Sequence, residues 1–157
     1  MRKLISALIL ATLCGVTTPA HNDDSHFENK QDVTVMVTKV SGNVYMLQGR
    51  GGNIGAIVEP EGIHIIDDDY KVVSEKLRDA LKELGSASPK FIVNTHWHGD
   101  HTEGNEFFGK QSIIVAHANV RKRLIDPPVI FGHKSPPYAS FALPTITYTE
   151  NITIHLN

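Results

Sequence analysis

The stretch Asn94-Thr95-His96-Trp97-His98-Gly99-Asp100-His101 is the most informative part of the sequence. It places three histidines and one aspartate within six residues. The apolar run Phe91-Ile92-Val93 comes just before it and predicts a buried strand, so the polar cluster begins where that strand ends. Imidazole and carboxylate groups at this density predict a metal site.

The spacing within the motif explains how its side chains can converge. In an extended chain, side chains two residues apart project to the same side, so His96 and His98 can both reach one metal ion. Gly99 allows a sharp turn, which aims Asp100 and His101 at a neighbouring point. Such a donor set suits Zn²⁺, with Fe and Mn as alternatives. The other interpretation is a surface cluster that only titrates near neutral pH.

Short β-rich runs joined by turns precede the motif. They cover residues 33–37, 44–47, 54–58 and 63–66. The glycines and prolines between them predict an antiparallel meander of four strands. Residues 73–84 then carry apolar side chains at helical spacing, and Gly85 is placed to end that helix.

A second strand and helix follow the motif, at residues 112–115 and 117–124. A meander followed by alternating helices and strands predicts an α/β (α+β) fold, in which helices pack on a sheet. Residues 126–144 are rich in proline and predict a long surface loop, and residues 146–156 alternate like a strand.

Two histidines outside the motif are expected to be structural. His64 alternates with the apolar Ile63 and Ile65, so we expect it on the exposed side of its strand. His117 lies where a strand meets a helix, which favours an exposed or capping role over metal binding.

Composition excludes several classes of protein. The chain has 157 residues, 41% of them hydrophobic, and a formal net charge of −2. These values are ordinary for a globular domain and exclude disordered and collagen-like chains. So small a net charge predicts no nucleic-acid partner.

The N-terminus predicts export. Arg2 and Lys3 precede an apolar run over residues 4–16, and Thr18-Pro19-Ala20 offers small residues for cleavage, so residues 1–20 are interpreted as a signal peptide. The run is too short for a stable membrane anchor, and a periplasmic or secreted bacterial protein is expected. Cys14 raises a lipoprotein alternative, although the residues before it form a poor lipid-attachment signal.

Cleavage at that point would remove the single cysteine, so a metal site in the remaining chain must use histidine and carboxylate ligands. We interpret residues 21–32 as a flexible leader and residues 33–157 as one domain.

The pattern H-x-H-x-D-H after an apolar strand resembles the signature of the metallo-β-lactamase superfamily. Residues 51–56 look like the glycine-rich hairpin of that family, and Ile65-Ile66-Asp67 looks like the strand whose aspartate supports its metal site. Residues 101–105 are similar to the stretch that follows the motif in many members. The resemblance covers about residues 33–124.

The resemblance implies roles for five residues. His96 and His98 would bind a first zinc ion, and Asp100 and His101 a second. Asp100 would also be catalytic, orienting the zinc-activated water that attacks the substrate. Asp67 would hold a histidine ring from outside the ligand set. A turn or helix-cap role is the alternative for Asp67, although its neighbour Asp69 is better placed for a cap.

The resemblance also implies that the chain is the N-terminal half of an αββα sandwich, apparently truncated at its C-terminus. Family members add a third histidine for the first zinc, a bridging aspartate or cysteine and a last histidine, whereas His155 here lies within a strand pattern. We therefore expect an exported zinc-dependent hydrolase that acts on a small-molecule ester, thioester, phosphoester or β-lactam. Association with a second chain would complete the fold. The alternative is a non-catalytic metal-binding or interaction module.

Overall fold

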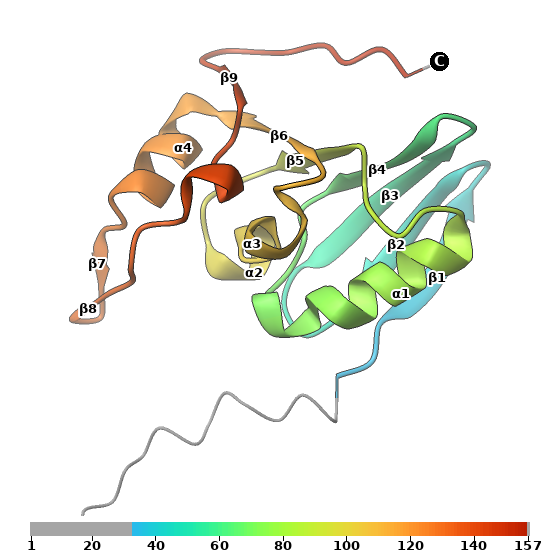
Figure 1. Cartoon of the computed structure of the whole chain (residues 1–157), viewed down its shortest axis with the longest axis horizontal. Coiled ribbons are helices and arrows are strands. Elements are labelled where there is room, and N and C mark those ends of the chain that lie inside the picture. The colour runs from blue at the N-terminus through green and yellow to red at the C-terminus, as the bar shows by residue number, and fades with distance from the viewer. Residues whose placement is uncertain (1–32, 157) are drawn as a thin grey trace, which may run out of the picture.

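The structure, a computed structural model, describes residues 33–156 and is built on one seven-stranded sheet (Figure 1). Its strands are β1 (Met36–Ser41), β2 (Val44–Gln48), β3 (Asn53–Glu59), β4 (Gly62–Ile66), β5 (Phe91–Asn94), β6 (Ile113–His117) and β9 (Ile146–Tyr148). They lie side by side in that order. The predicted signal peptide, its Cys14 and the leader over 21–32 fall outside the described residues. Among the described helices, none has the length and apolar character needed to cross a bilayer.

The pairing of neighbouring strands changes once across the sheet, from antiparallel to parallel. β1 to β4 are antiparallel, which confirms the predicted meander, and β4, β5, β6 and β9 are mutually parallel. Parallel neighbours require crossover connections, and helices supply them: η1 (Lys71–Val73) and α1 (Ser74–Leu84) lead from β4 to β5. The carboxyl ends of β4 and β5 therefore meet at one edge of the sheet, where their following loops lie close together.

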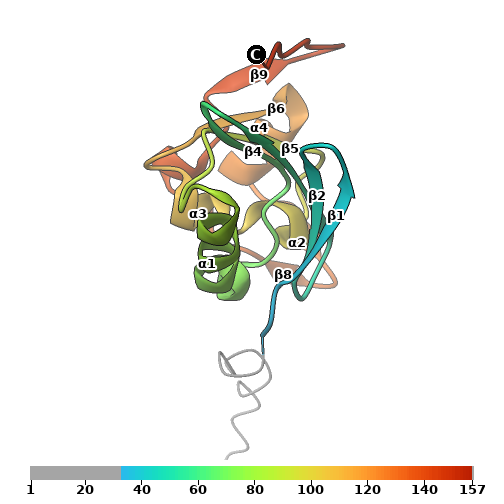
Figure 2. The ribbon, with the colours of Figure 1, turned by 90° about the vertical axis from the view of Figure 1, so that its right-hand side faces the viewer.

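Helix α1 covers one face of the sheet (Figures 1 and 2). Its Leu77 and Leu81 are fully buried against a core that includes Ile54 and Ile65. Burying each such side chain contributes about 1.5–3 kcal/mol, so this stripe is what fixes the helix on the sheet. Gly85 ends the helix at φ +128°, as its position predicts, because its N–H donates to the last carbonyls.

The opposite face of the sheet is also apolar. Cross-strand partners place Val44, Ile57, His64, Phe91 and Ile113 in one row on this face. The expectation that His64 is exposed is wrong: it is 8% exposed, and its ring stacks on Phe91 at 5.4 Å. Alternation along one strand identifies the face on which His64 lies, but it does not reveal that neighbouring strands make that face apolar too.

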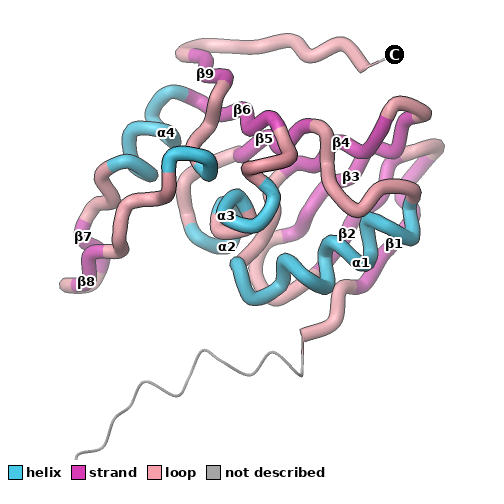
Figure 3. The backbone as a smooth tube through the Cα atoms, viewed as in Figure 1, coloured by secondary structure: helices cyan, strands magenta, loops and turns pink. Residues whose placement is uncertain are grey.

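Helices and loops follow β6 (Figure 3). Helix α4 (Ala118–Ile125) confirms the predicted helix. The segment predicted as loop over 126–144 contains the hairpin of β7 (Val129–Ile130) and β8 (His133–Lys134) and a 3-10 turn, η2 (Ser140–Ala142). The predicted strand over 146–156 ends earlier, at Tyr148, and the residues after it up to 156 pair with no strand among those described.

Candidate metal centre

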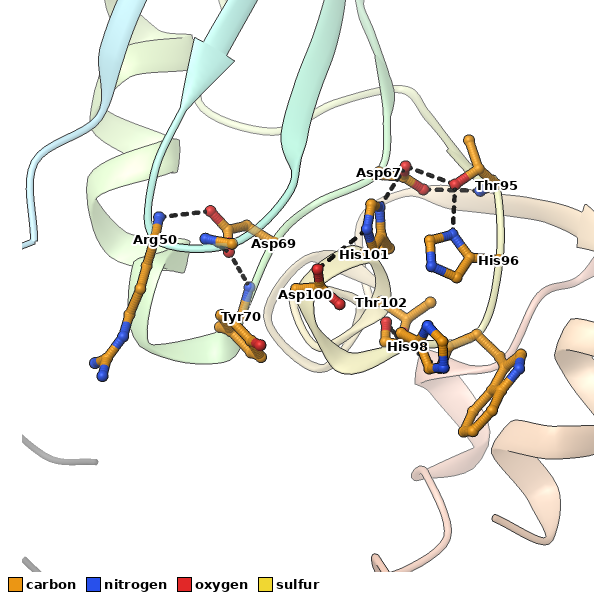
Figure 4. Close-up of polar contacts among 12 residues, drawn as sticks. Arg50, Asp67, Asp69, Tyr70, Thr95, His96, His98, Asp100, His101 and Thr102 are labelled. Carbon is orange, nitrogen blue, oxygen red and sulfur yellow. Dashed lines mark hydrogen bonds and ion pairs between the residues drawn. The ribbon is translucent and has the colours of Figure 1, made fainter. Parts of the chain in front are cut away.

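The histidine motif occupies the turn between β5 and a short helix, α2 (Gly99–Thr102). The backbone is extended at His98, with φ −67° and ψ 151°, and becomes helical at Gly99. The chain therefore turns at Gly99 as expected, but without the left-handed conformation that glycine favours. The helix presents Asp100 and His101 from its first turn, beside the imidazoles that precede it (Figure 4).

Asp67 ties the motif to the end of β4 (Figure 4). Its carboxylate is buried and accepts three hydrogen bonds, from the Thr95 N–H at 2.7 Å, the Thr95 hydroxyl at 2.7 Å and the His101 Nδ1 at 2.8 Å. Its own backbone is left-handed, at φ +63°, which aspartate tolerates better than most residues. A carboxylate here joins two adjacent parallel strands at the point where the motif begins.

These bonds fix the tautomers of two imidazoles. A carboxylate only accepts, so His101 carries its proton on Nδ1. The Thr95 hydroxyl gives its one hydrogen to Asp67 and therefore accepts from His96 Nδ1 at 3.0 Å. In their neutral form, His96 and His101 would therefore both carry an unprotonated Nε2, the state in which imidazole binds a metal.

A cation fits the contact between His101 and Asp100. His101 Nε2 lies 3.2 Å from the Asp100 Oδ2. With the proton of His101 on Nδ1, these two atoms are both acceptors, and a shared proton or metal ion would reconcile them. The chemistry of this pair is that of a zinc or similar site.

The remaining imidazoles lie close to that pair. The His96 ring centroid is 4.0 Å from that of His101 and 4.9 Å from that of His98. Burial, with the neighbouring His101 and His98 adding to it, lowers the pKa of His96 and favours its neutral, metal-binding form. Within residues 33–156, however, no three of these donors converge on one point. The donor set fits zinc in kind and falls short in number, since a tight site needs three or four protein ligands.

A glycine-rich turn packs on the motif. A Cβ on Gly52 would lie 2.5 Å from the His101 Cε1, and one on Gly51 would lie 2.5 Å from the Asp100 Cβ. Asp69 holds this turn, accepting from the N–H groups of Arg50, Gly51 and Tyr70 at 2.7–3.0 Å.

The helix-cap role expected for Asp69 is therefore wrong. Its carboxylate faces the turn before β3, and η1 begins without a side-chain cap. Burial raises the pKa of Asp69, and the three backbone donors oppose that shift.

Comparison with known proteins identifies the architecture. No protein-family model and no curated protein matches the sequence. BJP-1, a subclass B3 metallo-β-lactamase of Bradyrhizobium japonicum, aligns with a TM-score of 0.65 at 20% identity, over 82% of this chain and 50% of that one. LRA-12, a class B3 di-zinc metallo-β-lactamase from an Alaskan soil metagenome, aligns with a TM-score of 0.67 at 18% identity, over 83% and 52%. The chain has the metallo-β-lactamase fold.

The likeness extends over about half of that fold. A Cronobacter sakazakii metallo-β-lactamase with a HARLDQ motif gives the same proportion, covering 78% of this chain and 49% of its own, with a TM-score of 0.66 and 17% identity. The chain therefore spans about half the length of the solved metallo-β-lactamases it matches. At these identities the likeness establishes the fold, and the roles of individual residues stay predictions.

The structure shows residues around the histidine motif that sequence reasoning missed. Asn94 donates to the His101 carbonyl at 3.0 Å, and the buried Asn105 donates to Asn94 at 2.9 Å. Two side-chain amides thus link the backbone of α2 to the end of β5. Thr95 links His96 to Asp67, as described above. Asn94 and Thr95 directly precede the H-x-H-x-D-H pattern, but nothing in the spacing identifies their partners.

Other histidines lie away from the motif. His117 caps α4, accepting from the Asn119 N–H at 3.1 Å, which confirms the predicted capping role. His155 is exposed and lies beyond β9.

Proposed function

We propose that this chain is the N-terminal, metal-binding half of a zinc-dependent hydrolase. The observation that carries the proposal is the set of hydrogen bonds that joins Asp67 to His101 directly and to His96 through Thr95. Both rings use Nδ1 in these bonds, and His101 Nε2 lies beside the Asp100 carboxylate. A buried carboxylate that fixes imidazole tautomers in this way is typical of metal-binding histidines.

The residues divide into ligands and supports. His96 and His98 would hold one zinc ion, and Asp100 and His101 a second. Zinc, when bound, lowers the pKa of a coordinated water and so supplies a nucleophile at neutral pH. Asp100 would accept a hydrogen bond from that nucleophile and orient it toward the substrate. Asp67 would keep the His101 ring in place throughout.

The missing ligands would come from a second half of the fold. Val44, Ile66, Ile113 and Ile146 are 38–40% exposed on the sheet face away from α1. A sheet face of this kind is normally covered by another layer. We propose that a C-terminal half, in the same chain or in an associated one, covers this face and completes the site. The substrate of the complete hydrolase would be a small molecule with an ester, thioester, phosphoester or β-lactam bond.

The test is zinc stoichiometry and affinity of the purified chain. We expect a His96→Ala/His98→Ala double variant to lose at least roughly tenfold in zinc affinity. His133→Ala is the matched control, because His133 is exposed on the hairpin away from the motif. Equal zinc affinity of the double variant and the control would refute the proposal.

A second candidate follows from the shortage of converging donors in residues 33–156. The chain would then bind zinc weakly and act as a non-catalytic metal-binding or interaction module. Hydrolysis of ester, thioester and β-lactam substrates by the zinc-loaded chain separates the two functions. Weak zinc binding without turnover, even with the partner half supplied, would favour the module.

Export is proposed alongside the hydrolase. Cleavage after Ala20 would release the mature chain into the periplasm or the medium. Intact-mass measurement of the protein recovered from each fraction tests this, and an uncleaved chain retained in the cytoplasm would contradict it.

A further inference from the structure

A groove of about 270 Å³ opens beside the metal motif. Its walls come from the motif at Trp97 and His98, from α4 at Arg123 and Leu124, and from the segment that ends at Tyr138. This volume is near the lower end of small-molecule sites, so it suits a ligand of one ring rather than a polymer. We call it the Trp97 groove.

The Trp97 groove has a rigid apolar floor. Trp97 and Tyr138 pack against the buried cluster that contains Leu124 and Val120. The Tyr138 hydroxyl lies 3.0 Å from the Thr102 Oγ1, and Thr102 in turn donates to the His98 carbonyl at 3.0 Å. The floor is therefore tied to the backbone of the metal motif.

The Trp97 groove also adjoins a predicted metal ligand. The Trp97 ring centroid is 4.5 Å from that of His98. A ligand in the groove would have one end beside that imidazole, because His98 is among the lining residues. The groove thus offers a place for the part of a substrate that flanks the reacting bond.

One cation of the groove is available to a ligand. Lys71 is paired with Glu106 at 2.7 Å. The guanidinium of Arg123 lies over the Trp97 ring, with its central carbon 5.3 Å from the ring centroid, and it pairs with no carboxylate within residues 33–156. A guanidinium held on an aromatic face keeps its outward N–H groups free for a bidentate acceptor.

The charges of the groove limit the anion it can accept. The two cations, Lys71 and Arg123, are balanced by the carboxylates of Glu103 and Glu106 in the same lining. A monoanion would add one negative charge to this balanced lining, whereas a dianion such as a phosphate monoester would add two beside Glu103 and Glu106, so the lining favours the monoanion.

We propose that the Trp97 groove binds small aromatic monocarboxylates, with the carboxylate on Arg123 and the ring among the apolar side chains that line the groove. As a statement about the substrate class of the metal site, this rests on the proposed function. The binding step itself needs no metal. It can therefore be measured in the presence of a chelator, separately from zinc binding and hydrolysis.

Trp97 is the single tryptophan of the chain, so its fluorescence reports on the groove directly. The experiment titrates the full chain with phenylacetate in EDTA and follows Trp97 emission. Phenylacetamide, the neutral analogue, is the ligand control. We expect saturable binding of phenylacetate that is at least roughly tenfold tighter than binding of phenylacetamide, because the neutral amide cannot form the bidentate ion pair that a carboxylate forms with a guanidinium.

Variants assign the effect to one side chain. Arg123→Gln should weaken phenylacetate binding roughly tenfold or more and leave phenylacetamide binding unchanged. Arg123→Lys keeps the charge without the planar fork and should fall between. Lys122→Gln is the matched control, because Lys122 is exposed on the same helix and does not line the groove. Circular dichroism of each variant verifies folding.

The outcomes separate this inference from the proposed function. No binding of phenylacetate at millimolar concentration, or equal affinities in Arg123→Gln and Lys122→Gln, would overturn the groove proposal even if zinc binds. Arg123-dependent binding by a chain that does not hold zinc would support the groove and contradict the metal site.

Discussion

Asp67→Asn is the most direct test of how the histidine motif is organised. The substitution replaces Oδ2, which accepts from the Thr95 hydroxyl at 2.7 Å and from His101 Nδ1 at 2.8 Å, with an NH₂ group. Asparagine tolerates the left-handed backbone of this position as well as aspartate does, so the change isolates the carboxylate.

The predicted consequence is that the imidazoles of His96 and His101 change tautomer. The new NH₂ group donates to the Thr95 hydroxyl, which then turns its hydrogen toward His96 Nδ1. His101 Nδ1 likewise meets a donor in place of an acceptor. Both rings are therefore expected to move their proton to Nε2, the atom that a metal would need.

The magnitude follows from the bonds that change. Three bonds to a charged carboxylate, two from Thr95 and one from His101, become bonds to a neutral amide, so the free energy of unfolding should fall by about 2–4 kcal/mol. Zinc affinity should fall roughly 10–100-fold, as is usual when a group that orients a ligand is removed. Urea denaturation and chelator competition measure the two effects.

Tautomers can be read directly from long-range ¹H–¹⁵N correlations of the histidine rings. Asp67→Ala serves as a comparison, because it removes both the acceptor and the side chain best suited to a positive φ, and should be less stable than Asp67→Asn. If His96 and His101 of a folded Asp67→Asn variant keep the proton on Nδ1, the reasoning about this network is wrong.

Three further predictions concern other positions. Burial, and then the neighbouring Asp67, raise the pKa of Asp68 well above 3.8, so Asp68 binds its proton more tightly in the folded protein than in the unfolded chain. The free energy of unfolding should therefore fall as pH rises above about 4. Asp68→Asn should be more stable than the parent at neutral pH, and urea midpoints measured across pH would show this difference closing in acid. Gly52→Ala would place a Cβ 2.5 Å from His101 and should weaken zinc binding roughly tenfold, whereas Gly55→Ala, with 3.4 Å to its nearest neighbour, should not; equal zinc affinities would contradict the packing argument. Phe131, 99% exposed, begins the β7–β8 turn at φ +48°, so Phe131→Asn should raise the thermal midpoint and add about 1 kcal/mol, and an unchanged or lower midpoint would count against it.

Much of the fold was predictable because its signals are local. The meander and helix α1 follow from alternation and helical spacing within short windows, and both are confirmed. The hairpin of β7 and β8 was missed because two-residue strands are too short to show any period. Phe131-Gly132 is also an unusual pair for a turn with two positive φ angles, which asparagine and glycine usually form.

The candidate site was predictable only in part. The motif identifies His96, His98, Asp100 and His101 because they are close in sequence. Their supports are far away: the partners of Asp67 are 28 and 34 residues along the chain. Asp69 was misplaced for the same reason, since the turn it holds lies 18 and 19 residues before it. A side chain that bridges two strands cannot be read from either strand alone.

The strand order has a consequence for how the chain assembles. Because spatial order equals chain order, every strand after β1 adds to the edge of a sheet whose earlier strands have already been synthesised. No existing pair must separate to admit a later strand, which keeps loop closures short and favours growth from the N-terminus onward. Asp67 directly follows β4, and its partner Thr95 directly follows β5, so their hydrogen bonds require β5 to pair with β4. The bonds between Asp67 and Thr95 therefore form when β5, a strand of four residues, docks beside β4.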